Sequence, residues 1–301
     1  MLKEMALQML DKSKIKPHKV GNVYYGNRSF TLPTLLNDGI YYFKFFPSVN
    51  KSSIEADVAV VNYLIENRIS LPSFFQQNGN QIFCDENENI TFYASKFIDG
   101  DGSPVLSSTL IRDIVINIAR MHSKLRDFDK STINIEKVTD YQKMIELYIK
   151  NKCDYDSKGI EEYLERIIRI GIDDVPTYPI HSDLYMGNIK VQNGNFKSFM
   201  DFSDIRESYF EDDLGKFFQS VLMEDSIKTD DIANLIKVYE SESGIPLSKK
   251  NVYVSILYCM LDRYFNREHT VRDKQKMLSV VQELLEQLER KCVENNEIVF
   301  L

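Results

Sequence analysis

The chain has 301 residues and carries 45 acidic against 37 basic side chains, a net charge of −8. Its composition, 43% hydrophobic and 27% charged, excludes a disordered chain and a fibrous repeat. The acidic balance argues against a nucleic-acid binder, which needs a basic surface. The four cysteines show no paired spacing, and no apolar stretch approaches the roughly 18 residues that a membrane helix needs. We therefore expect a cytoplasmic protein with neither a nucleic-acid nor a membrane partner.

Strand signals dominate the region from residue 20 to residue 96, after a first amphipathic helix at 1–10. Aromatic and β-branched residues fill runs at 23–25, 29–36, 39–46, 81–84 and 90–96. Asn37-Asp38-Gly39 predicts a hairpin, because these residues tolerate a positive φ. A helix capped by Ser52-Ser53 is expected after the third run. The pattern predicts an antiparallel five-stranded sheet with one helix inserted.

Residues 97–104 contain two glycines and a proline and predict a linker. Beyond it, apolar residues recur at helical spacing over 106–128, 141–151, 159–170, 213–224, 230–242, 249–267 and 271–295. Only 178–202 alternates strand-like pieces with turns. The chain is therefore expected to form a bilobal α+β fold, with a sheet lobe at 1–97, a larger helical lobe at 98–301 and a cleft between them.

Two short segments carry the residues with the clearest chemistry, HSDLYMGN at 181–188 and MDFSD at 200–204. Asp183, Asn188 and Asp201 fall on predicted loops and strand ends, where side chains converge on a cleft. Phosphoryl transfer from a nucleotide needs a carboxylate that orients the attacking hydroxyl and oxygen ligands for Mg²⁺. The alternative is that these residues only form turns. Two such segments in this order, after a linker, favour the catalytic interpretation.

The same segments resemble those of the aminoglycoside phosphotransferase and choline kinase family, small-molecule relatives of the protein kinases. HSDLYMGN is similar to the HxDxxxxN pattern of that family, and MDFSD is similar to its metal-binding segment, with Ser203 in place of a glycine. Asp213-Leu214-Gly215 stands where the family has a DLA triplet, and 118–122 resembles its LAxLH helix. Tyr209-Phe210 departs from the usual Asp-Pro.

The resemblance implies a protein-kinase-like fold and an ATP- or GTP-dependent O-phosphotransferase that acts on a small molecule. Asp183 would accept the hydroxyl proton, and Asn188 and Asp201 would hold Mg²⁺. The lobe 1–97 would bind the nucleotide, and the lobe 98–301 would carry catalysis and the acceptor site. His181 would brace the catalytic loop through backbone hydrogen bonds.

The nucleotide contacts implied by the resemblance begin at Lys44, a charge within an aromatic strand, which would bind phosphates and pair with Glu55. The alternatives are a solvated lysine on an edge strand and a glutamate that only complements a helix N-terminus. A loop at 26–30, with Gly26 and Ser29, would cradle phosphates through its N–H groups.

The base of the nucleotide is expected at the linker, where the resemblance places main-chain hydrogen bonds near Ser95, Lys96 and Phe97. This expectation rests on position in the chain alone, because main-chain recognition leaves little trace in side chains.

The acceptor is expected to be cationic, an aminoglycoside or a related aminated sugar. Five acids occur between residues 204 and 213, and those other than Asp213, among them Glu207 and Glu211, would attract such a molecule. The alternative is a solvated acidic face. A choline or ethanolamine kinase would share every residue named so far. A non-catalytic kinase-fold protein of the spore-coat type is the rival from another class, and a protein kinase is disfavoured because no APE-like segment follows Asp201.

Overall fold

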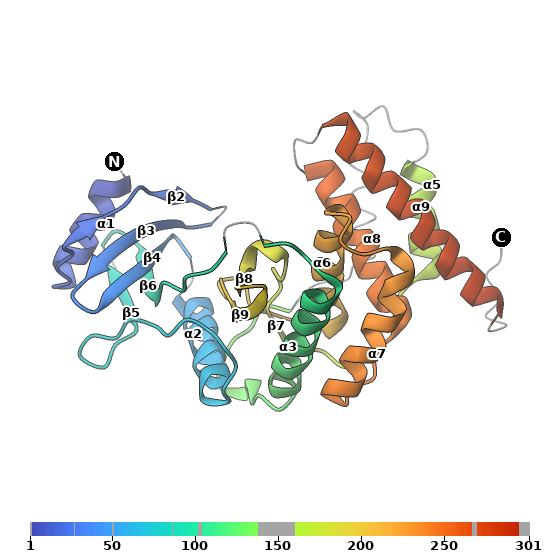
Figure 1. The fold of residues 1–301 in the computed structure, drawn as a ribbon. Helices are drawn as coiled ribbons and strands as arrows, with labels where there is room; N and C mark the ends of the chain where they lie inside the picture. The colour runs from blue at the N-terminus through green and yellow to red at the C-terminus, as the bar shows by residue number, and fades with distance from the viewer. Residues whose placement is uncertain are drawn as a thin grey trace.

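The protein is described by a computed structural model that covers residues 2–26, 28–49, 51–85, 87–101, 104–137, 160–266 and 270–294. A β-sheet with two helices occupies one end of the molecule, and a group of helices occupies the other (Figure 1). The predicted α+β class with an N-terminal antiparallel sheet is confirmed. The lobe boundary between residues 97 and 98 stays a prediction.

The N-terminal sheet has six strands, one more than predicted. They are β1 (Lys19–Val20), β2 (Tyr24–Tyr25), β3 (Phe30–Leu36), β4 (Gly39–Pro47), β5 (Ile82–Asp85) and β6 (Ile90–Lys96). The order is β1-β3-β4-β6-β5, and β2 also pairs with β3. The additional strand is β1, which pairs Lys19 with Leu35 and Val20 with Thr34. Two residues without an alternating pattern give no strand signal, so tertiary pairing alone creates β1.

Each face of this sheet is covered by one helix. Helix α1 (Leu2–Lys12) packs its buried residues against Phe43 and Phe45 of β4. Helix α2 (Lys51–Glu66) begins ahead of the serines expected to cap it, and its residues Ile54 and Val58 cover Phe46 on the other face. Because side chains alternate along a strand, Lys44 lies on the α2 side, opposite Phe43 and Phe45.

The second part of the protein is built mainly from helices. They are α3 (Ser108–Arg126), α5 (Ile160–Ile170), α6 (Phe210–Met223), α7 (Ile232–Ser243), α8 (Lys249–Asn266) and α9 (Val271–Glu294). Single-turn 3₁₀ helices occur at Lys130–Thr132, Met186–Asn188 and Thr229–Asp231. The helix expected at 141–151 lies outside the described residues. The others form as predicted, except that α6 begins three residues earlier and draws Glu211 and Asp212 into its first turn.

Two small antiparallel pairs carry the chain between these helices, as the alternation at 178–202 predicted. Strand β7 (Tyr178–Ile180) pairs with β10 (Arg206–Ser208), and β8 (Ile189–Gln192) pairs with β9 (Asn195–Phe199). The β8–β9 hairpin lies in the middle of the molecule, between the sheet and the helices (Figure 1). The two pairs fix the ends of the segments 181–188 and 200–204.

Helices α6 and α8 lie side by side, and Gly215 is the residue that permits their close approach (Figure 1). A Cβ atom at Gly215 would lie 2.4 Å from Cβ of Ser255. A larger residue would therefore force the two helices apart.

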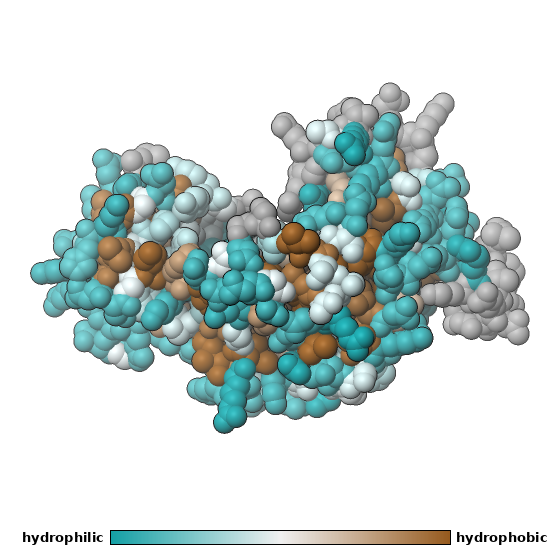
Figure 2. Space-filling view, viewed as in Figure 1, coloured by the Kyte–Doolittle hydropathy of each residue, from teal (hydrophilic) through white to brown (hydrophobic). Residues whose placement is uncertain are grey.

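The outer surface is largely hydrophilic on the face that Figure 2 shows, with hydrophobic patches over the sheet and over the junction with the helices. No helix of the described segments combines the length and the apolar composition that crossing a lipid bilayer requires.

Candidate active site

The loop between β7 and β8 brings two of the predicted site residues into contact. The Asn188 amide nitrogen donates to the Asp183 carbonyl oxygen at 2.8 Å and to its carboxylate Oδ2 at 3.0 Å. The amide oxygen of Asn188 is left for another partner. The Asp183 side chain keeps 44% of its surface exposed, so its carboxylate is accessible to a ligand. Ser182, just before it, has a φ of +66°, a strained conformation that occurs where surrounding structure holds a functional loop.

A buried hydrogen-bond network centred on Asp213 fixes the backbone of this loop. The N–H groups of His181 and Ser182 donate to the Asp213 carboxylate at 2.8 and 2.7 Å, and His122 Nε2 lies 3.1 Å from it. Burial opposes ionisation of Asp213, but the hydrogen bonds from His122 and His181 hold its pKa below the ordinary value. Asp213 therefore remains a fully buried carboxylate that fixes the backbone of the loop.

The two histidines of this region are positioning residues. His181 Nε2 contacts the Met200 carbonyl oxygen at 2.7 Å, while its Nδ1 accepts the Asp183 N–H at 3.2 Å. The imidazole therefore carries its proton on Nε2 and joins the segments 181–188 and 200–204. Burial lowers the pKa of His122, although Asp213 opposes this, so His122 is neutral and donates to Asp213. The brace expected of His181 is present in the structure.

Asp201 meets Lys44 at the junction between the sheet and the helical part. The Lys44 ammonium lies 2.5 Å from Asp201 Oδ1 and donates to the Ser203 hydroxyl at 2.6 Å. Burial works against ionisation of Asp201, but Lys44 and Ser203 lower its pKa below the ordinary value. Asp201 also has a φ of +58°. Ser203, which replaces a glycine of the family pattern, thus adds a hydrogen-bond partner for both charges.

A cavity of about 930 Å³, open to solvent, lies beside this ion pair. Five predicted site residues line it: Lys44, Ser95, Phe97, Asn188 and Asp201. Its remaining walls are largely apolar and aromatic: Tyr42, Val61, Pro72, Phe74, Tyr93, Met200 and Phe202. Sequence reasoning missed these seven, because aromatic and aliphatic residues are common throughout the chain. A largely apolar cavity whose lining also includes the charged residues Lys44, Lys190 and Asp201 suits a nucleotide, whose base is apolar and whose phosphates are charged.

The expected pair between Lys44 and Glu55 is not formed in this structure, which corrects that prediction. Glu55 is exposed and lies 3.4 Å from Lys51, on the side of α2 that faces away from the core. The carboxylate that α2 turns inward is Asp57, which is 5% exposed and lies close enough to Lys44 to interact with its charge. Burial raises the pKa of Asp57 well above its ordinary value. The helix phase, which places 54, 57, 58 and 61 inward, could have indicated Asp57.

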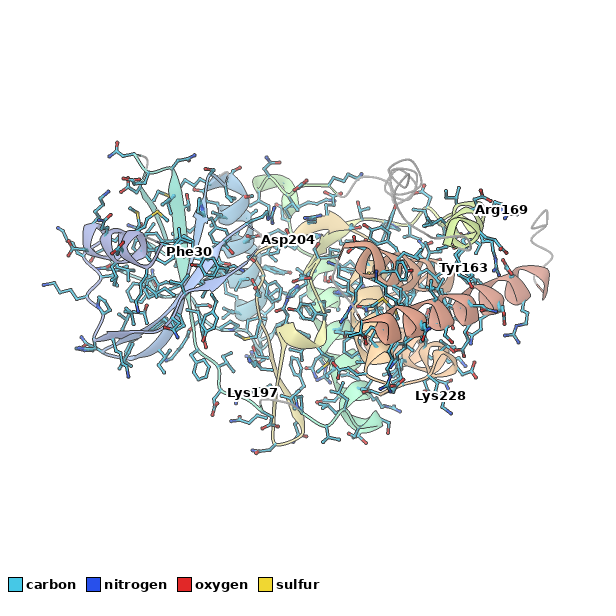
Figure 3. The ribbon with its side chains drawn as sticks, turned by 90° about the horizontal axis from the view of Figure 1, so that it is seen from above. Phe30, Tyr163, Arg169, Lys197, Asp204 and Lys228 are labelled. Atoms are coloured by element: carbon cyan, nitrogen blue, oxygen red, sulfur yellow. The ribbon has the colours of Figure 1, made fainter. Side chains whose placement is uncertain are left out.

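The loop between β2 and β3 contains Gly26 and Ser29, which share a backbone hydrogen bond of 2.8 Å. Asn27 lies outside the described residues, and the residues described around the cavity include neither Gly26 nor Ser29. Arg28, which was not among the predicted site residues, donates to the Ser203 carbonyl oxygen and to Asp204. Asp204 lies between the sheet and the helices (Figure 3), so this contact ties the loop to the segment 200–204.

The backbone at the linker has fewer free N–H donors than expected for main-chain recognition of a base. The Lys96 N–H donates to the Ser73 carbonyl oxygen and the Phe97 N–H to the Ile40 carbonyl oxygen, both at 2.8 Å. These two donors are therefore occupied within the protein. Ser95 and Phe97 line the cavity, but Lys96 is not among the described lining residues.

The acidic residues on which the expectation of a cationic acceptor rests interact mostly with other residues of the protein. Glu207 lies 2.8 Å from Lys130 and accepts from the Thr177 hydroxyl at 2.6 Å. Glu211 is 3% exposed and accepts from the Ser248 N–H at 2.9 Å. Burial raises the pKa of Glu211 to about 7. Neither residue is among the described residues that line a cavity, so this structure gives no support to their proposed attraction of a cation.

A second cavity, of about 1120 Å³ and open to solvent, begins at Asp183. Its lining also includes residues of α6 and α8, Tyr185 and Arg206. Asp183 thus borders the second cavity while Asn188, on the same loop, borders the first. Residues of the loop 181–188 therefore border both cavities.

The residues expected to hold a metal, Asn188 and Asp201, offer an amide oxygen and a carboxylate, and both line the first cavity. Among the described residues, no group of three or more His, Cys, Asp or Glu could hold a metal ion by itself. Mg²⁺ at nucleotide sites is bound by one or two protein oxygens and by phosphates, not by a complete protein cage. The residues therefore fit a magnesium ion that binds together with a nucleotide.

Comparisons with known proteins match the chain by its structure. No protein family profile matches the chain, and no curated protein matches it. Among solved structures, an amicoumacin kinase in complex with AMP-PNP, Ca²⁺ and Ami has a TM-score of 0.66 at 15% identity, over 95% of this chain and 96% of that chain.

Two further solved structures share this likeness. A spectinomycin phosphotransferase in complex with ADP and spectinomycin has a TM-score of 0.66 at 12% identity, over 94% of this chain and 98% of that chain. The choline kinase LicA from Streptococcus pneumoniae has a TM-score of 0.59 at 13% identity, over 94% and 99%. The chain therefore has the protein-kinase-like fold of the aminoglycoside phosphotransferases and choline kinase, as the resemblance implied.

Proposed function

We propose that this protein is an ATP- or GTP-dependent O-phosphotransferase that phosphorylates a hydroxyl group of a small molecule. One observation carries the proposal: Asp183 and Asn188, held 3.0 Å apart on one loop, each border a different cavity. A phosphoryl group that passes from a nucleotide in the first cavity to an acceptor in the second must cross at this loop. Fold alone does not establish chemistry, so the argument rests on these residues.

Asp183 is the proposed catalytic residue. Its Oδ2 is oriented by the Asn188 amide, and its Oδ1 lies 3.6 Å from the Lys216 ammonium. The carboxylate accepts the proton of the acceptor hydroxyl as the hydroxyl oxygen bonds to the γ-phosphorus. The bond from that phosphorus to the β–γ bridging oxygen breaks, and the nucleoside diphosphate leaves. General-base catalysis of this kind contributes about 10²–10⁴-fold to a rate. The network around Asp213 aligns the loop, and alignment supplies much of the remaining acceleration.

Lys44 is the proposed phosphate ligand, and Asn188 and Asp201 are the proposed ligands of Mg²⁺. A bound Mg²⁺ would neutralise charge on the phosphates and orient them for transfer. The aromatic wall at Tyr42 and Phe97 would hold the base. Gly26 and Ser29 remain a proposed phosphate loop, now with Arg28 as its anchor to Asp204. Glu55 is not part of the proposed site, because its side chain faces solvent.

The acceptor class is the finer part of the proposal. The neighbours named above phosphorylate or bind amicoumacin, spectinomycin or choline. An aminated acceptor was expected for this chain, but Glu207 and Glu211 do not support it. A choline or ethanolamine kinase remains the second enzymatic candidate on the strength of the fold. Because the donor is a nucleoside triphosphate, we place the reaction in the cytoplasm.

Titration calorimetry with ATP and GTP, with and without Mg²⁺, tests the nucleotide site. The wild-type chain should bind one nucleotide and bind it more tightly with Mg²⁺. In Asp201→Ala the effect of Mg²⁺ should disappear, since a charged ligand is lost. Asp225→Ala is a matched control, because Asp225 is 84% exposed, pairs with Lys276 and is not among the described lining residues of the first cavity. A full effect of Mg²⁺ in Asp201→Ala would mean that the metal is held elsewhere, and no nucleotide binding would favour the non-catalytic alternative.

A further inference from the structure

Lys44 is the proposed phosphate ligand, and a lysine serves as one best when its flexible side chain is held in one conformation beforehand. Fixing the rotatable bonds of a lysine costs conformational entropy, and a neighbouring group that fixes them in the free protein lowers the cost of binding. The Lys44 side chain is only 16% exposed, so that group must belong to the protein. Because Lys44 has this task only if the chain binds a nucleotide, an inference about the group rests on the proposed function.

Helix α2 does not supply this group. Among the described residues, no ion pair joins Lys44 to a carboxylate of α2. Glu55 lies 3.4 Å from Lys51 and faces solvent. Asp57 turns inward and acts on Lys44 through space, but its carboxylate is hydrogen-bonded to the Ile205 backbone N–H. The direct contacts that hold Lys44 therefore come from another part of the chain.

The Ser203 hydroxyl contacts both charges of the proposed phosphate and metal site. Its oxygen accepts a hydrogen bond from the Lys44 ammonium at 2.6 Å, and it donates to Asp201 Oδ1 at 2.7 Å. A hydroxyl has one donor and two acceptor lone pairs, so one conformation of the serine can make both bonds. Lys44 and Asp201 are themselves 2.5 Å apart, and the three groups form a closed triangle. Ser203 thereby fixes the direction of the Lys44 side chain.

Ser203 can hold another side chain because its own backbone is anchored. The Ser203 carbonyl oxygen accepts a hydrogen bond at 3.4 Å from Arg28, on the loop between β2 and β3. The next residue, Asp204 (Figure 3), pairs with the same arginine and lies 3.2 Å from Arg206 at the start of β10. The hydroxyl is therefore presented by a segment that is bonded both to a loop of the sheet and to the helical part of the protein.

The hydroxyl does not take the place of a phosphate. Lys44 and Asp201 line the first cavity, but Ser203 is not among its described lining residues and borders a separate cavity of about 490 Å³. An ammonium group has three N–H donors, so Lys44 can keep its bond to Ser203 and still donate to phosphate oxygens. Once Asp201 serves as a ligand of Mg²⁺, its pair with Lys44 is weakened, and the bond from Ser203 still directs the lysine.

We propose that Ser203 is a positioning residue of the nucleotide site, and that its hydroxyl directs the Lys44 ammonium toward the phosphates in place of a carboxylate on α2. The glycine that the family pattern has at this position carries no side chain that could do so. The alignment of Lys44 then follows the segment 200–204 and not helix α2. Hydrogen bonds to charged groups are among the stronger ones in proteins, so the loss of this hydroxyl should be measurable.

Titration calorimetry with ATP and with GTP, in the presence of Mg²⁺, measures the contribution of Ser203. Ser203→Ala removes the hydroxyl and should weaken nucleotide binding about tenfold, as expected for a lost hydrogen bond to a charged group. Ser203→Thr keeps the hydroxyl and should retain most of the affinity. Ser241→Ala, at an exposed position of α7, is the matched control and should bind as the wild type does. Ser203→Gly removes the same hydroxyl and serves if Ser203→Ala does not fold.

A double-mutant cycle with Lys44 separates positioning from a merely structural role. In Lys44→Met there is no ammonium to direct, so the addition of Ser203→Ala should have no further effect on nucleotide affinity. A structural role, or one exerted through Asp201 alone, would keep the full effect of Ser203→Ala in that background and would overturn the proposal. Asp57→Asn tests helix α2 as the rival and should weaken binding less than Ser203→Ala does; a larger loss in Asp57→Asn also overturns the proposal.

The two proposals fail in different ways. If the wild-type chain binds no nucleotide, the proposed function itself is wrong. If the wild-type chain binds nucleotide and Lys44→Met weakens this binding, but Ser203→Ala binds as tightly as the wild type or more tightly, only the assignment of Ser203 is wrong.

Discussion

Glu211 provides a test of the account that does not depend on any substrate. From the sequence it was a candidate carboxylate for a cationic acceptor, but the structure places it in the first turn of α6, 3% exposed and bonded to the Ser248 N–H. Glu211→Gln keeps an oxygen that accepts this hydrogen bond and removes the titrating group. The substitution should therefore change the pH dependence of stability while leaving acceptor kinetics unchanged.

The expected magnitude follows from the pKa. Burial raises the pKa of Glu211 in the folded chain to about 7, against an ordinary value of 4.5. Below that ordinary value both folded and unfolded chains hold the proton, and the group has no effect. Above it the folded chain retains a proton that the unfolded chain releases, so the free energy of unfolding falls by about 1.4 kcal/mol per pH unit. Over the interval from 4.5 to about 7 the loss amounts to about 3 kcal/mol.

Urea denaturation at about pH 5 and about pH 8 measures this difference. Glu211→Gln should match the wild-type chain to within about 1 kcal/mol at the lower pH and exceed its stability by up to about 3 kcal/mol at the higher pH. Glu207→Gln is the control with the opposite sign. Burial opposes ionisation of Glu207, but Lys130 and Thr177 lower its pKa, so its removal should lose stability near neutral pH. Equal stabilities of Glu211→Gln and wild type at the higher pH would refute the reasoning.

Two further substitutions test the packing behind the site. Gly215→Ala would place a Cβ 2.4 Å from Ser255 Cβ and should destabilise the protein by about 1–3 kcal/mol, measured as a lower urea midpoint; an unchanged midpoint would contradict the close approach of α6 and α8. Asp213→Asn replaces one acceptor oxygen with a donor that faces the N–H groups of His181 and Ser182. It should lower the free energy of unfolding by about 3–5 kcal/mol, and a loss below about 1 kcal/mol would mean that this carboxylate does not hold the loop.

The sequence predicted the fold well because its signals were local. The hairpin at Asn37-Asp38-Gly39 and the strong helical periodicities required only neighbouring residues, and the structure contains them. The segments 181–188 and 200–204 also carried their own spacing, so Asp183, Asn188 and Asp201 could be named as candidate site residues from the sequence. Strand β1 was missed because its two residues form a strand only by pairing with β3.

The parts of the site that could not be predicted depend on distant contacts. Lys44 pairs with Asp201, more than 150 residues away, and nothing near Lys44 in the sequence indicates this partner. Glu55 was predicted from its position in the first helical turn, and Asp57 was not considered, whereas the phase of α2 decides which carboxylate faces inward. The sequence could not distinguish the acids at 207 and 211 from a binding surface, because their partners are distant in the chain. Glu207 contacts Lys130 and Thr177, and Glu211 accepts from the Ser248 N–H.

The central claim is that Asp183 serves the transfer of a phosphoryl group between the two cavities. The most direct measurement follows the γ-phosphate of labelled ATP into organic phosphate, with wild-type enzyme and with Asp183→Asn, over a panel of small hydroxylated acceptors. The account predicts Mg²⁺-dependent transfer by the wild-type enzyme and a loss of at least about 10²-fold in Asp183→Asn, with nucleotide affinity nearly unchanged. Transfer by Asp183→Asn within a few-fold of wild type would contradict it.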